Sequence, residues 1–489
     1  MPNPLLFEIA KAGRGSRHLP ALEGSEAEVL ASIPPADRRT GAVGLPEVAE
    51  LDLARHIERL SRRNHYIEKD FYPLGSCTMK YNPKLHERIA ANPLITGLHP
   101  GLPEETVQGA LRMLVELEEC LCGITGMEAF TLQPAAGAHG EFTAMRIIEA
   151  YYRKKGETRR KVITTDSAHG TNPASVRRIG WEPVEVRSNS RGEVDLKALE
   201  SLCDATTAAF MLTLPNTLGL FESQLPAIMD IVHGVGAQMY LDGANLNALL
   251  GLVRPGDVGF DVMHSNVHKT FSTPHGGGGP GAGPVGVRSH LEAFLPRPRA
   301  VRDGERYRWN NDYPDSIGRI HSQFGNFAVL LRAYAYIRHH GATGLRDVQR
   351  HAILNANYLR KLIEKSFPVP YDRIGMHEFV SSAAIYRGQG VRAGDVGKRL
   401  LDYGFYAPTI AFPLIVREAL MIEPTETESK ETLDRFAAAM NEVASEIRND
   451  PSVVQNAPHT TPVRRVNESL ASRRPVLKWE DAESKTEHA

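Results

Sequence analysis

Two charged residues attract attention because together they could support the chemistry of one cofactor. Asp242 lies in the segment MYLDGAN, and Lys269 follows 27 residues later in HKT, after a second short apolar run. An amine can form an imine with the aldehyde of pyridoxal phosphate (PLP), and a buried carboxylate keeps the pyridine nitrogen protonated so that the ring accepts electrons. Either residue alone indicates only a turn aspartate or a solvated lysine. The pair predicts a PLP site with Lys269 as the Schiff-base lysine.

Two further polar residues lie where they could contact such a cofactor. His169, in DSAHGTNP, follows one probable strand, and its flat imidazole could stack on a pyridine ring. Asn216, in PNTLG, could hydrogen-bond the ring hydroxyl. The structural alternatives are a surface or capping histidine and a turn asparagine beside a proline. The neighbouring motifs favour the functional interpretation for His169.

A segment of small residues could bind the cofactor phosphate. QPAAGAHGE runs from a probable strand into a helix, and Ala136, Gly137 and Ala138 would let backbone N–H groups approach an anion. Helix N-termini favour phosphate through these N–H groups and the helix dipole. A tight strand-to-helix turn that needs small residues for packing is the alternative.

Two other segments are unusual in composition. Residues 275–283, HGGGGPGAG, formally contain GxGxxG, but they neither follow a strand and open a helix nor end in Gly-Lys-Ser/Thr, so a dinucleotide or Walker A site is not expected. They indicate close backbone approach to a cofactor or a partner chain, or a plain flexible loop. The segment YPLGSCTMKYNP gathers hydroxyls, the thiol of Cys77 and an amine, and it could reach into a cleft or serve as a connector.

These motifs must be positioned by a regular framework. Short apolar runs alternate with probable helices, which is typical of a mainly parallel sheet covered on both faces. The runs fall at 130–132, 162–164, 208–214, 239–241 and 262–263. In such sheets the functional residues gather beyond the carboxyl ends of the strands, where the distinctive motifs fall. The sequence therefore predicts an α/β fold.

The chain is expected to have four parts. Residues 1–105 are rich in proline and glycine around a predicted helix at 47–62, which indicates an arm. Leucines at helical spacing then indicate the start of a large domain at 106–370. Residues 371–450 predict a smaller α+β domain that ends in a helix at 430–448. Residues 451–489 predict a surface tail.

The composition indicates which kinds of binding partner and which cellular compartment to expect. The chain has 489 residues, 42% of them hydrophobic and 24% charged, with a net charge of -1, which gives no bias toward nucleic acid or an anionic membrane. No leader pattern or spanning apolar stretch is evident, so we expect a cytoplasmic protein. The four cysteines form neither a disulfide framework nor a CxxC metal pattern, and we expect no metal.

Several motifs together resemble one family across nearly the whole chain. YPLGSCTMKYNP, QPAAGAHGE, DSAHGTNPAS, PNTLGLFE, DGANLNA and HSNVHKTFSTPHGGGGPGAGPVGV are similar to the glycine dehydrogenase (decarboxylating) family, the P-protein of the glycine cleavage system. Some members of that family consist of two different subunits, and the chain resembles the second, lysine-bearing subunit. The resemblance implies the fold of type I PLP-dependent transferases, with a large sheet domain, a small C-terminal domain and an N-terminal arm.

The resemblance also implies roles for individual residues. Lys269, Asp242 and His169 would be the Schiff-base lysine, the partner of the pyridine nitrogen and the stacking residue. The remaining residues of the cofactor pocket would be Ala136, Gly137, Ala138, Asn216, Ala244, His268 and Thr270. Those on the substrate side would be Ser76, Thr78 and Lys80.

The implied reaction is the PLP-dependent decarboxylation of glycine. The aminomethyl group would pass to the oxidised lipoyl disulfide of H-protein, and a lysine-lacking first subunit would complete an α2β2 assembly. Two alternatives remain. Another fold type I enzyme, such as a glutamate decarboxylase or a cysteine desulfurase, would share Asp242, Lys269 and His169. A non-catalytic scaffold subunit should lack the lysine, which this chain has.

Overall fold

The protein is described by a computed structural model that covers residues 4–15, 23–41, 43–99, 101–274 and 281–477. It divides into two compact units, one made of residues 70–460 and the other of residues 1–69 and 461–489. The second unit contains the short helices α1 (Leu6–Ile9), α2 (Glu26–Ala31), α3 (Glu50–Ser61) and α18 (Glu468–Arg473). The four-part division drawn from the sequence stays a prediction.

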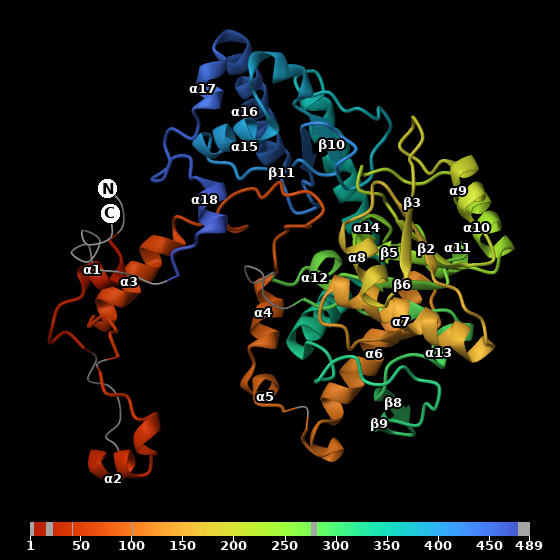
Figure 1. Ribbon diagram of the computed structural model, residues 1–489, viewed down its shortest axis with the longest axis horizontal. Helices are drawn as coiled ribbons and strands as arrows, with labels where there is room; N and C mark the ends of the chain where they lie inside the picture. Colours follow the sequence, from red (N-terminus) through yellow and green to blue (C-terminus); the bar gives the residue numbers. More distant parts are fainter. Residues whose placement is uncertain (1–3, 16–22, 42, 100, 275–280, 478–489) are drawn as a thin grey trace. The chain divides into compact units, whose positions relative to one another are not determined.

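A seven-stranded sheet forms the centre of the larger unit (Figure 1). Its strands are β1 (Ala129–Thr131), β2 (Lys161–Thr165), β3 (Glu182–Val186), β4 (Thr207–Thr213), β5 (Gln238–Gly243), β6 (Val262–Ser265) and β7 (Val285–Val287). Their order across the sheet is β1-β7-β6-β5-β4-β2-β3. All neighbours are parallel except β7, which runs antiparallel to both β1 and β6. The prediction of a mainly parallel sheet is confirmed.

Both faces of this sheet are buried, as its nearly continuous apolar strands require. Along β4, Phe210 and Leu212 belong to one core, while Ala209 and Met211 belong to the core on the opposite face. Successive side chains of a strand point to opposite faces, so one strand contributes to two cores. The α/β architecture with helices on both faces is therefore confirmed.

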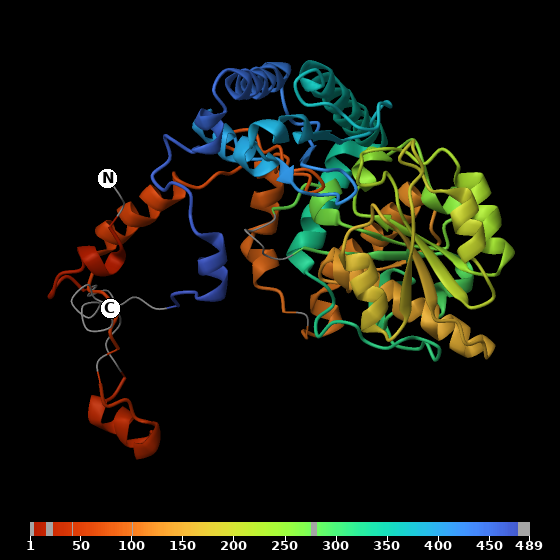
Figure 2. The ribbon, with the colours of Figure 1, turned by 45° about the horizontal axis from the view of Figure 1, so that its top comes forward.

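Helices cover the two faces of the sheet (Figures 1 and 2). The first core includes residues of α6 (Gln108–Thr125), α9 (Leu196–Leu202), α10 (Leu225–Gly234) and α14 (Phe327–Ile363). The second includes residues of α7 (Gly137–Lys155), α8 (Thr171–Arg178) and α13 (Ser289–Glu292). Helix α14 is interrupted at Gly341, whose φ of 60° and ψ of -176° are not helical. Its last turns belong to a third core, so one long element serves both the large and the small sheet.

The small sheet is antiparallel and has the order β10-β12-β11. Its strands are β10 (Phe379–Ser382), β11 (Thr409–Ile410) and β12 (Ala419–Ile422), and the helices around it are α15 (Ala393–Asp402), α16 (Lys430–Asn449) and α17 (Pro451–Gln455). Apolar residues of α15 and α16 pack on one face of this sheet. The predicted C-terminal helix corresponds to α16.

The N-terminal motif is an integral part of the small sheet. Leu74 forms an antiparallel bridge with Ile422, and the amide of Gly75 donates to the carbonyl of Met421 at 3.3 Å. A Cβ atom on Gly75 would lie 2.2 Å from the side chain of Met421, so this contact requires glycine. The composition of this segment had given little reason to expect burial, yet Thr78 and Lys80 are 1% and 3% exposed.

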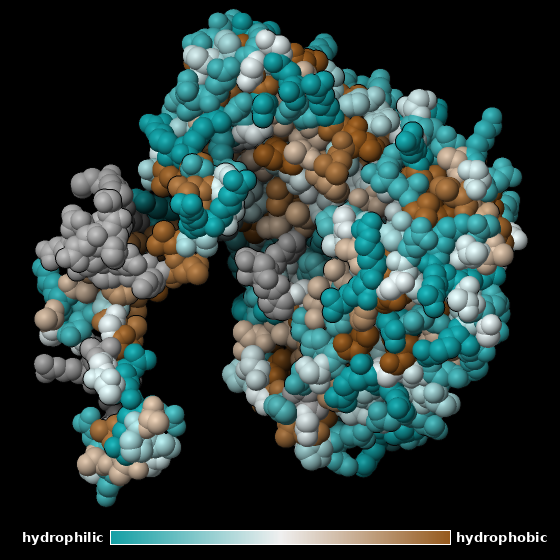
Figure 3. All heavy atoms as spheres, viewed as in Figure 1, coloured by the Kyte–Doolittle hydropathy of each residue, from teal (hydrophilic) through white to brown (hydrophobic). Residues whose placement is uncertain are grey.

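The remaining elements connect these parts. Helices α4 (Lys84–Ala90) and α5 (Pro93–Thr96) follow the N-terminal motif, α11 (Pro255–Val258) and α12 (Val267–Thr270) flank β6, and β8 (Arg299–Asp303) pairs with β9 (Arg306–Asn310) in a hairpin. Much of the face shown in Figure 3 is hydrophilic, with scattered hydrophobic residues. Within the described ranges, no helix has the length and apolar character that a membrane span requires.

Candidate active site

A cavity of about 130 Å³ lies at the carboxyl ends of β4, β5 and β6, the edge that the motifs predicted. The predicted residues that line it are Ser76, Gly137, Ala138, His169, Asp242, Ala244 and Lys269. They come from segments far apart in the chain and meet because parallel strands present their carboxyl ends at one edge. The structure thus brings Lys269 and Asp242 into one cavity.

Asp242 is held in place by several donors at the end of β5. Its Oδ1 accepts from the amide of Ala244 at 3.0 Å, its Oδ2 lies 3.5 Å from the hydroxyl of Thr213, and it is 2% exposed. His264 on β6 lies directly opposite in the strand register, with its Nε2 at 3.5 Å from Oδ1. A carboxylate fixed in this way can bind a protonated ring nitrogen inside the cavity.

The tautomer of His264 follows from its other neighbour. Burial raises the pKa of Tyr240 well above its usual value, so this phenol keeps its proton, and its oxygen lies 2.5 Å from Nδ1 of His264. Because the carboxylate of Asp242 near Nε2 can only accept, the phenol is the donor to Nδ1. Burial also lowers the pKa of His264, which is therefore neutral and carries its proton on Nε2. That proton faces Asp242 and stabilises its charge. His264 is part of the motif HSNVHKTF, but its role was not predicted.

Lys269 lies on the short helix α12, directly after β6. The strand ends at Ser265 and the helix begins at Val267, so the lysine enters the cavity from the strand next to that of Asp242. Its positive charge lowers the pKa of His377 and opposes the raised pKa values of Glu141 and Glu378. The ammonium group of Lys269 thus contributes positive charge to a region that contains several buried acidic side chains.

His169 is placed by the loop after β2. Its Nδ1 accepts the N–H of Thr171 at 3.2 Å, and its ring meets that of Phe412 edge-on at 5.9 Å between centroids. Burial lowers the pKa of His169, with Asp242 acting against this shift and Lys269 adding to it. The imidazole is therefore neutral near pH 7 and presents a flat uncharged surface.

Glu141 supports this loop and was not predicted. Its carboxylate accepts from the hydroxyls of Thr171 at 2.7 Å and Ser175 at 3.0 Å, which joins α7 to α8. Burial, together with the charge of Asp242, raises the pKa of Glu141 to about 7. The residue follows Gly137 by one helical turn, and this spacing within QPAAGAHGE is the signal that could have identified it.

The first turn of α7 suits an anion. Ala136 precedes the helix and provides no side-chain cap, so the first amides of a 19-residue helix stay available where Gly137 and Ala138 line the cavity. A Cβ atom on Gly137 would lie 2.3 Å from Oδ1 of Asn266. The Oδ1 of Asn266 and the Oγ1 of Thr270 are buried without a hydrogen-bond partner. The uncapped amides and the hydroxyl of Thr270 can donate to an anion, which fits a phosphorylated ligand such as PLP, whereas Oδ1 of Asn266 can only accept.

The part of the glycine-rich run that the structure describes packs closely on this turn. A Cβ atom on Gly283 would lie 2.1 Å from the carbonyl oxygen of Ala136, and its amide donates to the carbonyl of Pro134 at 2.9 Å. Residues 275–280 lie outside the described ranges. Gly283 thus approaches the backbone of its own chain closely, and the predicted approach to a cofactor or a partner chain stays a prediction.

Asn216 is a turn residue in the structure. Its Nδ2 donates to the carbonyl of Gly192 at 2.8 Å, and its Oδ1 accepts from the amides of Leu218 and Leu220, each at 3.1 Å. Because the carboxamide is occupied by the backbone, Asn216 does not line the cavity. The structural alternative is the better description of this residue.

Other predicted residues lie behind the cavity wall. His268 contacts the backbone of Ala282 through Nδ1, and the carbonyl of Thr270 accepts from Lys80 at 2.9 Å. The hydroxyl of Thr78 donates to Glu423 at 2.6 Å. The residues that line the cavity without having been predicted are Glu141, Thr171, Thr213, Thr217, Asn245, His264 and Asn266.

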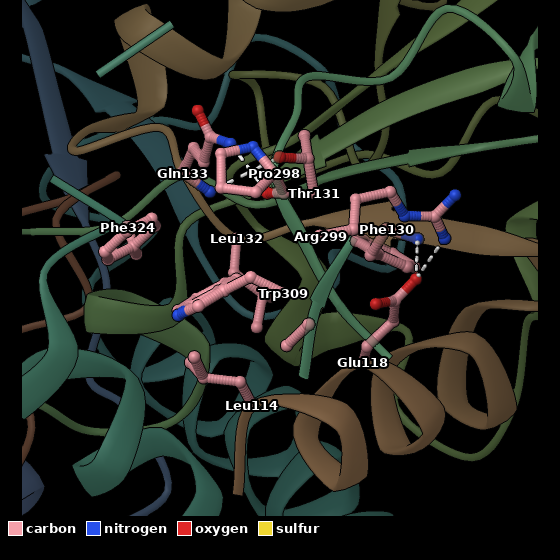
Figure 4. Close-up of a pocket in the computed structure, with 11 residues that line it drawn as sticks. Leu114, Glu118, Phe130, Thr131, Leu132, Gln133, Pro298, Arg299, Trp309 and Phe324 are labelled. Carbon is pink, nitrogen blue, oxygen red and sulfur yellow. Dashed lines mark hydrogen bonds and ion pairs between the residues drawn. The ribbon is translucent and has the colours of Figure 1, made fainter. Parts of the chain in front are cut away.

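A second, smaller cavity of about 30 Å³ lies between β1 and the β8–β9 hairpin (Figure 4). Arg299 there bonds Glu118 at 2.9 Å. Gln133 donates to the carbonyl of Pro298 at 3.1 Å and accepts from the amide of Ile320 at 3.2 Å. These contacts fix the end of β1 and thus the entry into α7, which makes this cavity part of the framework behind the site.

Comparison with known proteins agrees with this geometry. The family model "Glycine cleavage system P-protein" matches residues 25–301, and "Glycine dehydrogenase, C-terminal domain" matches residues 348–461. A chain from Bacillus licheniformis named probable glycine dehydrogenase (decarboxylating) subunit 2 is 53% identical over 97% of this chain and 98% of its own length. A chain of the same name from Thermotoga petrophila is 54% identical over 97% and 99%.

Solved structures show the same fold. A glycine decarboxylase (P-protein) of the glycine cleavage system, in an inhibitor-bound form, matches with a TM-score of 0.72 and 20% identity over 86% of this chain and 95% of its own. A cysteine desulfurase from Thermococcus onnurineus matches with a TM-score of 0.59 and 16% identity over 77% and 95%. At these identities the matches support the fold class alone, the one predicted from the sequence. With two matching family models and relatives more than half identical over nearly its whole length, the chain belongs to the glycine cleavage system P-protein family.

Proposed function

We propose that this chain is the glycine-decarboxylating subunit of the glycine cleavage system. It releases CO2 from glycine and transfers the remaining aminomethyl group to the lipoyl disulfide of H-protein, the activity of a glycine dehydrogenase (aminomethyl-transferring). The family and the names of the full-length relatives support this activity. The observation that carries the proposal is the cavity into which Lys269 and Asp242 both project.

PLP is the cofactor that fits this cavity. It would supply an electron sink for the electron pair that remains on glycine when CO2 leaves. The amine of Lys269 would hold it, the carboxylate of Asp242 would keep a proton on the ring nitrogen, and the amides of Gly137 and Ala138 would bind the phosphate. The neutral ring of His169 would lie against the cofactor ring, as the lowered pKa of this histidine favours.

The surrounding residues prepare the site for decarboxylation. The proton on Nε2 of His264 and the amide of Ala244 both face the buried carboxyl group of Asp242 and hold it in position. With glycine bound in the cavity, the amine of Lys269 would be placed to hold or deliver a proton close to the reacting carbon. Burial of the cavity excludes water, so the carbon is kept for the lipoyl disulfide instead of being protonated by solvent.

Two protein partners are part of the proposal. The relatives are named subunit 2, which supports a complementary first subunit, and we propose an α2β2 assembly. Residues of the smaller unit expose large apolar side chains, since Val43, Leu45, Leu51 and Ile57 are 57–76% exposed. Apolar surface of this kind is typical of a protein interface. We also propose a cytoplasmic location, which the four unpaired cysteines support.

A cysteine desulfurase is the main alternative within this fold. Sulfur transfer needs a nucleophilic thiolate near the cofactor. Burial, reinforced by Glu423 and Glu378 and opposed by Lys269, raises the pKa of Cys77 to about 11, so this thiol stays protonated at neutral pH. The presence of Lys269 in the cavity argues against a non-catalytic scaffold. The glycine-cleaving function is therefore the better supported one.

The first experiment combines labelling with an exchange assay. The full chain is loaded with PLP, with and without the first subunit, reduced with borohydride and mapped by peptide mass spectrometry. We expect the label on Lys269 and, with lipoylated H-protein, exchange of labelled bicarbonate into glycine. Label on another lysine would contradict the assigned site. Sulfide release from cysteine in place of glycine-dependent exchange would favour the desulfurase.

A further inference from the structure

Two glutamates that the proposed chemistry does not use lie together behind the cavity. Glu378 directly precedes β10 and Glu423 directly follows β12, and these strands pair with Phe379 opposite Ile422. The two carboxyl groups therefore emerge side by side from one end of the small sheet. Both side chains have no exposed surface.

These carboxyl groups hold the segment 76–78. The amide of Ser76 donates to Oε2 of Glu378 at 2.6 Å, and the amide and hydroxyl of Thr78 donate to the two oxygens of Glu423 at 2.8 and 2.6 Å. Ser76 and Thr78 have φ values of 59° and 49°, a left-handed conformation that is unfavourable for both residue types. The backbone needs these hydrogen bonds to keep this shape. Because Ser76 lines the cavity, the pair of glutamates shapes one of its walls.

The charges around the pair are unbalanced. Lys269 faces both carboxyl groups, while Lys80 is bound to Glu426 at 2.7 Å. Glu426 and the thiol of Cys77 also lie near the pair and add no positive charge. Two ionised carboxylates would thus face one ammonium group in a position with no exposed surface.

The neighbouring histidine does not supply a second positive charge. The Nε2 of His377 lies 3.7 Å from Oε1 of Glu378 and 4.0 Å from Oε1 of Glu423, but burial and Lys269 lower its pKa to about 3. Burial raises the pKa of Glu378 well above its usual value, with Glu423 adding to this shift, and burial also raises the pKa of Glu423. Because the histidine is neutral, it does not offset the negative charge of the pair. A proton on one of the two glutamates is the remaining way to reduce that charge.

We propose that Glu378 and Glu423 share one proton and act as positioning residues, which hold segment 76–78 against the glycine-binding side of the cavity only while that proton is present. This inference rests on the proposed function, since it assigns a role in binding glycine to the wall that Ser76 forms. When the pair loses its proton, repulsion between the two carboxylates separates β10 and β12 from the segment. Glycine binding then weakens while the chemical step is unchanged.

A shared proton explains the cluster better than a metal ion. The ligand atoms of His377, Glu378 and Glu423 lie within 4.8 Å of one another, which a divalent cation would allow. Each carboxylate oxygen, however, already has a donor from Ser76, Thr78, Asn245 or Asn247. The ammonium of Lys269 would also repel a second cation.

Thermal unfolding of the full chain without cofactor tests the shared proton. A carboxyl group with a raised pKa stabilises the fold fully below its unfolded pKa, and this contribution is lost as the pH rises through its folded pKa. We expect the wild-type Tm to fall relative to that of Glu378→Gln, which mimics the protonated group, as the pH rises above the ordinary glutamate pKa of 4.5 toward the raised pKa of the pair. Glu418→Gln, at the opposite end of the same sheet, is the matched control and should keep the wild-type slope. Equal slopes for wild type and Glu378→Gln would overturn the proposal.

Kinetics of the complete system test the role in glycine binding. With the first subunit and lipoylated H-protein, we expect the wild-type KM for glycine to rise by about tenfold per pH unit once the pair is ionised, with kcat unchanged. In Glu378→Gln this rise should disappear, whereas Glu378→Leu should raise KM at every pH. A fall in kcat with constant KM would overturn the positioning role.

Two further outcomes separate this inference from its alternatives. Stoichiometric zinc or manganese in the wild type that is lost in Glu378→Gln would show a metal site and overturn the shared proton. The Tm difference could also appear as expected while glycine-dependent exchange is absent at every pH. This result would contradict the proposed function and the role in glycine binding, but it would support the shared proton.

Discussion

The Nζ atom of Lys80 lies 2.9 Å from the carbonyl oxygen of Thr270, the residue that follows Lys269. The same ammonium group bonds Glu426 at 2.7 Å and the hydroxyl of Tyr336 at 3.3 Å. Lys80 therefore joins four segments: the N-terminal motif, α12, α14 and the loop after β12. It supports the helix that carries Lys269 from behind, instead of facing the substrate as predicted.

Replacement of Lys80 by methionine should destabilise the protein strongly. The side chains of Lys80 and Glu426 are 1% and 8% exposed, so the mutation leaves a buried carboxylate without its cation. Removal of one partner of a buried pair costs about 3–5 kcal/mol. Lys430→Met is the control, because the Lys430–Asp434 pair has the same distance of 2.7 Å but exposed side chains, and its loss should change stability far less. Denaturant unfolding of both variants measures the difference, and similar losses would contradict the bracing role.

Lys269→Ala should abolish turnover and leave the fold intact. The side chain enters a cavity and no described core residue depends on it for packing, whereas the proposed chemistry requires its amine. Bicarbonate exchange, circular dichroism and borohydride labelling together check this expectation. Lys361→Ala, in an exposed ion pair on α14, serves as the control and should keep wild-type exchange. Wild-type rates in Lys269→Ala would remove this lysine from the mechanism.

Asp242→Asn should reduce kcat by about 100-fold or more. Asparagine can still accept the amide of Ala244, but it has no charge to keep a proton on the ring nitrogen. An N-methylated PLP analogue carries this positive charge permanently, so it should restore part of the rate in the variant. The exchange assay with both cofactors measures the effect. No difference between the two cofactors would mean that Asp242 acts in another way.

Sequence patterns predicted those helices and strands whose structure is determined by their own residues. The apolar run at 208–214 predicted β4 because that strand is buried on both faces, and the helical pattern at 430–448 predicted α16. Strand β3, EPVEV, was missed because its first four residues are half-buried or exposed at the sheet edge and only Val186 is buried. Strand β7, VGV, was missed because three residues after a glycine-rich run carry too little periodicity.

The candidate site was predictable to the extent that motifs follow strand ends. Asp242 and Lys269 meet because β5 and β6 are neighbours, which the alternation of strands and helices already indicated. Glu378 and Glu423 could not be predicted in the same way. Their proximity depends on the pairing of β10 with β12, strands that are 36 residues apart along the chain and separated by α15. No short motif specifies such a pairing.

Asn216→Ala should lower stability without a direct effect on cofactor binding. The mutation removes three hydrogen bonds to the backbone of Gly192, Leu218 and Leu220, and it leaves buried backbone groups unsatisfied at about 1–3 kcal/mol. Urea unfolding should show this loss, while PLP fluorescence titration at low temperature should give a wild-type dissociation constant. A large change in that constant at wild-type stability would instead return Asn216 to the cofactor pocket.

Glu141→Gln should change how stability depends on pH. Burial and Asp242 raise the pKa of Glu141 to about 7, against an unfolded value of 4.5. The folded protein therefore holds this proton more tightly, so the wild type loses about 1.4 kcal/mol per pH unit relative to the variant as the pH rises between the two values. Above about pH 7 this difference should be constant.

The comparison requires a variant that keeps the contacts of Glu141. Glutamine can still accept from the hydroxyls of Thr171 and Ser175, whereas Glu141→Leu cannot and should be less stable at every pH. Urea unfolding of wild type and both variants at a series of pH values measures the three curves. Parallel curves for wild type and Glu141→Gln would show that folding leaves the pKa of Glu141 unchanged, which would contradict the effect of burial and Asp242.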